Sequence, residues 1–277
     1  MGFEVMLNPV VFALKPFCDF FLHSLRKDFH NMRIKEFIDK LDAFFERDDM
    51  QGAGEHLRFS RKEAEAENDK QFLLTVLNEM MGYYRKTREE ERGLESVFSG
   101  LSLVKELHFE EKAVGATTML NAATTLKAFG RASEAVIYYE SASLIYDKLF
   151  LPYDVRIAGL CNNYALTLVD LENYSAAEEK YKKALSILNK YDDKLTDIAN
   201  TYVNMAHLYD AMGNYEKIEE CLDSAYSVLQ DDKNRNGYYA YTCRKCAPSF
   251  GYFGYFEVEK ELNERADKIY EGNRAVF

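Results

Sequence analysis

Asparagine recurs at corresponding places along this 277-residue chain. Asn121, Asn163 and Asn204 each stand two residues before a small residue that we expect in the core. Asn162 precedes one of them, and Asn78 lies one place earlier in its own segment. A side-chain amide both donates and accepts hydrogen bonds, so a line of them suits the backbone of an extended peptide whatever its side chains. The alternative is that these amides join neighbouring helices within the scaffold.

Charged and ionisable residues follow one and two helical turns further along the same face, namely Arg85, Lys127, His207, Asp210 and Arg244. The three cations suit an acidic side chain or a terminal carboxylate, and Asp210 suits the opposite charge. The alternative for each is a solvated surface charge. Together with the asparagines, these residues form our candidate peptide-binding groove.

Cys243 and Cys246 form the one short motif that is typical of metal or redox chemistry. A zinc site needs a second pair of ligands at suitable spacing, and the other cysteines and the histidines are isolated in the sequence. We interpret both thiols as structural, with Cys246 at the small core position that Ala165 and Ala206 occupy. Because no phosphate-binding glycine loop or catalytic constellation is present either, we predict no catalytic residue, no metal, no cofactor and no enzyme activity.

A sequence repeat must position these residues. Ala142, Ala184 and Ala225 follow one another at steps of 42 and 41 residues, a period typical of solenoid proteins. Similar steps outward reach three more small residues, Ser60, Gly100 and Ala266. Each copy holds two apolar-periodic segments of helical length, separated by a break rich in Gly or Asn, which stop helices readily. Such helix pairs bury their apolar stripes only by stacking on one another.

This register predicts an all-α solenoid over residues 32–277, with six helical hairpins at about 33–68, 70–108, 111–150, 154–191, 195–230 and 237–271. Residues 1–31 stand outside the repeat. Their segment 17–30 has an aromatic side, and we consider three roles: a cap on the first hairpin, an occupant of the groove, or an extension of little consequence. A start at Met32 is a further alternative.

The segments 173–178 (Asn-Tyr-Ser-Ala-Ala-Glu) and 199–206 (Ala-Asn-Thr-Tyr-Val-Asn-Met-Ala) resemble the tetratricopeptide repeat, especially the long repeats of kinesin light chains and bacterial proteins. The resemblance implies a right-handed superhelix whose first helices line the concave side and bind a protein or peptide. It also implies that asparagines placed like Asn121, Asn163 and Asn204 hold the peptide backbone. The chain departs from the family pattern in having no Trp and in having a repeat-ending proline only at Pro152.

Composition narrows the choice of partners. The net charge of −11 argues against general nucleic-acid binding and against anionic membrane surfaces. Five cysteines, an odd number spread over helices, fit reduced thiols in the cytosol better than a disulfide framework. Aromatic residues concentrate in 238–256; we expect most of them in the core, and the rest are a candidate docking or homodimer surface.

The sequence therefore favours a cytoplasmic, non-catalytic scaffold that binds a protein or peptide segment. One alternative is a peptide-sensing regulator resembling bacterial quorum-sensing tetratricopeptide-repeat receptors, although residues 1–31 are too short and too little basic to form a DNA-binding unit. The other is an adaptor subunit of a larger enzyme system, with the chemistry on a different chain.

Overall fold

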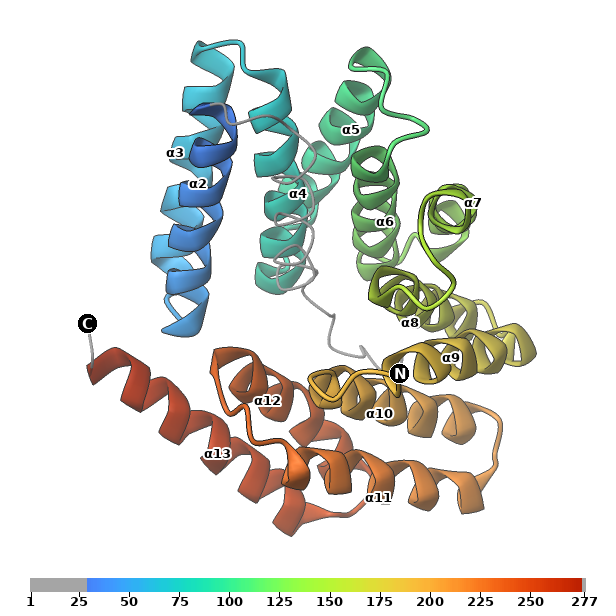
Figure 1. The fold of residues 1–277 in the computed structure, drawn as a ribbon. Helices are drawn as coiled ribbons and strands as arrows, with labels where there is room; N and C mark the ends of the chain where they lie inside the picture. The colour runs from blue at the N-terminus through green and yellow to red at the C-terminus, as the bar shows by residue number, and fades with distance from the viewer. Residues whose placement is uncertain (1–28, 276–277) are drawn as a thin grey trace. The chain divides into compact units, whose positions relative to one another are not determined.

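The computed structural model describes residues 29–275, and all the regular elements of this part are α-helices. The roles considered for residues 1–28, and Cys18, lie outside the described residues. The chain divides into two compact units, one of Met1–Phe45 with Asp49–Pro152 and the other of Glu46–Asp48 with Tyr153–Phe277. Each unit is a set of helical hairpins (Figure 1).

The helices of the first unit, blue to green in Figure 1, form three consecutive pairs. Their bounds are α2 (Phe29–Glu46), α3 (Met50–Ala66), α4 (Lys70–Thr87), α5 (Glu90–Glu106), α6 (Ala113–Ala128) and α7 (Ala132–Leu149). Within this unit α4 also packs against α6, so the first helices of successive pairs are neighbours.

The second unit, yellow to red in Figure 1, repeats the arrangement. Its helices are α8 (Val155–Asp170), α9 (Tyr174–Leu188), α10 (Leu195–Ala211), α11 (Tyr215–Asp231), α12 (Gly237–Tyr252) and α13 (Phe256–Ala275). Here α10 packs against α8 on one side and against α12 on the other, so three first helices lie in succession.

Each hairpin reverses at a residue with left-handed backbone angles. These residues are Asp48, Arg88, Gly130, Glu172, Gly213 and Gly254, at successive steps of 40, 42, 42, 41 and 41 residues. Glycine adopts this conformation without steric cost, whereas Asp48, Arg88 and Glu172 adopt it with a Cβ in place. The left-handed residues give a register for the whole array that does not depend on matching side chains.

The small residues of the sequence repeat lie where the helices of a pair approach each other. Ser60, Gly100, Ala142, Ala184, Ala225 and Ala266 are all buried. At Gly100 an added Cβ would stand 2.7 Å from the methyl group of Met81, so a side chain there would require the Met81 side chain to move. Tyr139 in the first unit and Tyr181 in the second are fully buried, which agrees with the predicted all-α hairpin repeat.

Helix starts are specified locally by short polar side chains. The side chains of Asp49, Asp69, Asp154 and Asn236 each accept a hydrogen bond from a backbone N–H in the first turn of the helix that follows. No helix in the part of the chain that the structure describes combines the length and hydropathy of a membrane-spanning segment.

Candidate functional site

One position of the repeat carries a polar residue in every hairpin from α4 onward. It lies nine residues before the left-handed residue, and we call it the polar register. Its members are Glu79 and Asn121 in the first unit, and Asn163, Asn204 and Lys245 in the second. All five side chains are buried, which is unusual for such residue types because buried polar groups normally need hydrogen-bond partners.

In the first unit the asparagines belong to the scaffold. The amide of Asn121 donates to the side-chain oxygen of Asn78 at 2.8 Å. Asn78 in turn donates to the carbonyl of Leu74 at 2.8 Å and to Oγ1 of Thr118 at 3.0 Å. These bonds join α4 to α6, and the side-chain oxygen of Asn121 is left buried without a hydrogen bond within the described residues.

The two cations predicted in the first unit differ in their surroundings. Arg85 is 2% exposed, and its Nη1 donates to Oγ1 of Thr125 at 2.9 Å and to the carbonyl of Asn121 at 3.3 Å. Arg85 therefore takes part in the α4–α6 junction. Lys127 is half-buried in the last turn of α6.

In the second unit the neighbouring residues Asn162 and Asn163 have different surroundings. Asn162 lies ten residues before Glu172, as Asn78 lies ten before Arg88, and it makes the equivalent bond, from its amide to Oγ1 of Thr201 at 2.8 Å. The side-chain oxygen of Asn163 is buried with no hydrogen-bond partner among residues 29–275. The side-chain oxygen of Asn162 is also buried without a partner within these residues, so the two asparagines differ in that only Asn162 donates its amide to Thr201 on the next hairpin.

The predicted residues at the end of α10 bridge to α12. His207 Nε2 lies 2.8 Å from Oγ of Ser249, and its ring stacks near Tyr252 and Phe253, with centroids 5.8 and 5.1 Å away. Burial lowers the pKa of His207, and the carboxylate of Asp210 opposes that shift. Asp210 itself accepts a 3.0 Å hydrogen bond from the hydroxyl of Tyr252.

The structure corrects the sequence register in the last hairpin by one residue. Ala247, not Cys246, lies seven residues before the left-handed residue, as Ala165 and Ala206 do. Consequently Arg244 is not the equivalent of the register asparagines. Its guanidinium pairs with Asp267 at 2.6 Å and lies 4.6 Å from the ring centroid of Tyr270, which places it against α13.

Residues 156–231, which span α8 to α11, match the family model described as tetratricopeptide repeat. A comparison with curated protein sequences found no match. Solved structures with a similar fold include BtubC (BKLC) from P. vanneervenii, which is 19% identical with a TM-score of 0.61 over 80% of this chain and 90% of that one.

Two further structures have the same repeat architecture. The Rap protein complexed with competence and sporulation factor is 14% identical, with a TM-score of 0.60 over 88% of this chain and 66% of that one. A putative kinesin light chain from Podosopora anserina with nearly identical TPR-like repeats is 16% identical, with a TM-score of 0.50 over 71% and 94%. This chain has the tetratricopeptide-repeat fold.

The sequence analysis missed two residues of this helical-hairpin array, the charged members of the polar register. Glu79 is 1% exposed, and its Oε1 has no hydrogen-bond partner within the described residues. Burial raises the pKa of Glu79 well above its usual value; the carboxylate of Asp42 adds to that shift and Arg85 opposes it. Lys245 is the second such residue. Counting back nine residues from Arg88 and Gly254 would have found both.

The cysteines of the described helices are thiols within the core. Cys161, Cys221, Cys243 and Cys246 are buried and form no disulfide with one another. Burial raises the pKa of Cys243 to about 11 and that of Cys246 to about 12, so both stay protonated at neutral pH. Among residues 29–275, no group of three or more His, Cys, Asp or Glu side chains is placed to hold a metal ion.

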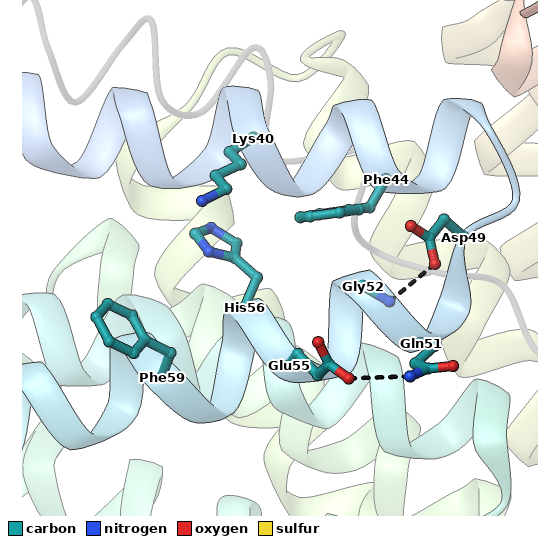
Figure 2. Close-up of a pocket in the computed structure, with 8 residues that line it drawn as sticks. All are labelled: Lys40, Phe44, Asp49, Gln51, Gly52, Glu55, His56 and Phe59. Carbon is teal, nitrogen blue, oxygen red and sulfur yellow. Dashed lines mark hydrogen bonds between the residues drawn. The ribbon is translucent and has the colours of Figure 1, made fainter. Parts of the chain in front are cut away.

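A hollow of about 590 Å³ lies on the first helical hairpin, on α2 and α3 (Figure 2). Its polar lining is largely engaged within the hairpin: Asp49 accepts from the backbone N–H of Gly52 at 2.8 Å, and Gln51 donates to Glu55 at 3.0 Å. His56 lies 3.1 Å from the carbonyl of Phe37, and burial lowers its pKa. Phe44 and the exposed Phe59 add aromatic surface to this polar lining.

Proposed function

We propose that this protein is a non-catalytic scaffold that binds a peptide or an extended protein segment along the first helices of its second unit, α8, α10 and α12. The observation that carries the proposal is the contrast between Asn162 and Asn163. Asn162 donates its side-chain amide to the next hairpin, whereas Asn163 makes no equivalent bond within residues 29–275, and the side-chain oxygens of both are buried without a hydrogen-bond partner there. An unpaired buried polar atom is unfavourable, and a bound peptide N–H would satisfy it.

The neighbouring side chains suit the same role. Asn204 occupies the next member of the polar register on α10, and His207 and Asp210 follow on that helix. Side-chain amides on adjacent helices match the alternating donors and acceptors of an extended backbone. Ionisable groups beside them would select among peptide sequences.

Two narrower functions are compatible with this proposal. The similarity to a Rap protein that was solved with competence and sporulation factor favours a peptide-sensing regulator. The alternative is an adaptor subunit that brings a larger enzyme system to its substrate. The free, buried thiols favour a cytoplasmic protein, and the net charge of −11 favours protein partners over nucleic acids or anionic membranes.

Peptide selection tests the proposal. The immobilised protein is exposed to a random decapeptide library, and retained peptides are identified and their dissociation constants measured. We expect the double variant Asn163→Ala with Asn204→Ala to weaken their binding by about tenfold or more, the usual effect of losing hydrogen bonds to a ligand. The matched control is Asn173→Ala with Asn214→Ala, because these loop asparagines lie in the same hairpins and make no side-chain cap bond.

Either of two results would contradict the proposal: the wild-type protein retains no peptide above background, or the register double variant binds the retained peptides as tightly as the loop control does. If neither of these results is found, affinity capture from native lysate can identify the natural partner.

A further inference from the structure

The first helix of the array, α2, leaves open a stripe of its surface that the later first helices bury. Counted back from the left-handed Asp48 by 16, 12, 8 and 4 residues, the members of this α2 stripe are Met32, Glu36, Lys40 and Phe44. The first three side chains are exposed, Met32 by 52%, and Phe44 is half-buried. In all five later hairpins the residues 12, 8 and 4 places before the left-handed residue are buried; on α6 they are Thr118, Ala122 and Leu126.

Contacts with the preceding hairpin cover this position of the repeat. Thr118 accepts a hydrogen bond from Asn78 on α4 at 3.0 Å, and in the second unit Thr201 accepts one from Asn162 on α8 at 2.8 Å. Tyr209, eight residues after Thr201, donates to Glu178 on α9 at 2.7 Å. Within residues 29–275 no hairpin precedes α2, so the α2 stripe is the equivalent stacking face without a preceding hairpin to cover it.

The α2 stripe is complementary to a reversed copy of itself. Its residue types run apolar, acidic, basic, apolar at four-residue spacing. Residues four apart form one ridge of a helix, and such ridges of two helices interdigitate. When two α2 helices cross antiparallel about a two-fold axis between residues 36 and 40, Glu36 meets the partner's Lys40. Met32 then meets the partner's Phe44, so one surface supplies two ion pairs and two apolar contacts, as a two-fold interface requires.

The hollow on α2 and α3 offers space for the methionine of a second copy. Lys40 and Phe44 line the hollow from α2, and Phe59, which is 61% exposed, lines it from α3 (Figure 2). Methionine is flexible and polarizable, so it fills irregular spaces and packs well beside aromatic rings. The partner's Met32, placed opposite Phe44, would therefore lie at this hollow.

We propose that the α2 stripe is the interface of a homodimer in which the α2 helices of two copies cross antiparallel. The proposal does not depend on peptide binding by the second unit. A second copy fits better than an unrelated segment, because the α2 stripe presents in reverse order the complement of its own charges. Each first hairpin thereby gains the neighbouring helix that it lacks among the described residues.

Charge reversal tests the homodimer. Sedimentation velocity of the full chain from about 1 μM to about 200 μM measures its dimer dissociation constant. We expect the wild type to dimerise in this range. Glu36→Lys alone and Lys40→Glu alone should each weaken dimerisation by about tenfold or more, because the two-fold axis turns both ion pairs into like-charge contacts. An equimolar mixture of the two variants should form a heterodimer with about wild-type affinity, since each chain then carries the complement of the other's charges.

The control variants Glu179→Lys and Lys260→Glu make the same charge changes at exposed residues of α9 and α13, where Lys260 is 71% exposed, and should leave the dissociation constant unchanged. Melting curves check that every variant is folded. A wild type that stays monomeric at the highest concentration, as when residues 1–28 or another protein cover the α2 stripe, overturns the inference. A dimer that tolerates both single reversals, or a mixture of the two variants that stays monomeric, overturns it as well.

Discussion

Asn162 donates its side-chain amide to Oγ1 of Thr201 at 2.8 Å and so joins the hairpin α8–α9 to the hairpin that follows it. Asn78 makes the same bond to Thr118 at 3.0 Å in the first unit. The two asparagines occupy equivalent positions, ten residues before a left-handed residue. The bond is therefore a repeated device of the scaffold, and it frees the next position in sequence for another use.

Adjacent asparagines should respond differently to truncation. We expect Asn162→Ala to lower the free energy of unfolding by about 1 kcal/mol, because it removes a buried hydrogen bond. Asn163→Ala should leave stability unchanged or raise it, since the Asn163 oxygen is buried without a partner within the described residues. Urea denaturation of both variants measures the difference. Equal losses of stability would show that Asn163 also belongs to the scaffold.

Glu79 should destabilise the fold at neutral pH. Its pKa is raised by burial above the unfolded value of 4.5, so the folded state keeps its proton at pH values where the unfolded state has released it. Its contribution to stability is therefore most favourable below pH 4.5 and is lost as the pH rises towards the folded pKa. We expect Glu79→Gln to gain about 1–3 kcal/mol at pH 7, the usual penalty of an unsatisfied buried polar group, and little at pH 4.

Thermal melts of wild type and Glu79→Gln across pH 4–7 check this expectation. The exposed Glu95→Gln is a suitable comparison, since its side chain is 52% exposed on α5. If the melting temperatures of wild type and Glu79→Gln differ by the same amount at every pH in that range, Glu79 does not titrate as its burial requires.

The destabilising effect of Lys245 on the fold should change with pH in the opposite direction to that of Glu79. Burial lowers its pKa to about 8 from the unfolded 10.5, an effect that Cys246 and Asp197 partly oppose. Below pH 8 both states are charged and the folded state carries the full burial penalty; between pH 8 and 10.5 that penalty recedes as the folded state loses its proton first. Lys245→Met should thus melt higher than wild type at pH 7, with a gap that narrows towards pH 10.

The same melts on Lys260→Met separate this effect from a general change in net charge. If the difference in melting temperature between Lys245→Met and wild type stays constant from pH 7 to pH 10, Lys245 is charged and solvated in the folded protein.

Glu172 should be replaceable by glycine with a gain in stability. It turns the α8–α9 hairpin at a φ of +59°, where a Cβ is unfavourable, while Gly213 makes the equivalent turn at +69°. We expect Glu172→Gly to stabilise the protein by up to about 1 kcal/mol and Gly213→Ala to destabilise it by about 1–2 kcal/mol. Space is not the obstacle at Gly213, since nothing lies within 4 Å of an added Cβ. Paired denaturation curves that failed to move in opposite directions would refute the backbone argument.

The hairpin repeat was predictable because it depends on small residues that the sequence displays directly. Ala142, Ala184 and Ala225 mark where paired helices touch, and all three are fully buried. The rotation of each helix was harder to predict. Asn162 and Asn163 differ by about 100° around the same helix, and only packing against α10 decides which of them meets Thr201.

The last hairpin shows how a register error propagates. Cys246 and Ala247 are both small and both buried, so composition alone does not say which one continues the alanine series. Counting from the left-handed Gly254, the residue equivalent to Asn163 and Asn204 is Lys245, next in sequence to the predicted Arg244. Charged residues in a position otherwise held by asparagine also escape a search for repeated residue types, as Glu79 did.

Because Asn163 and Asn204 are neutral and Lys245 is charged, the two ends of the second unit's polar register are chemically unlike. A peptide lying along these helices would therefore meet neutral amides on α8 and α10 and a buried ammonium group on α12.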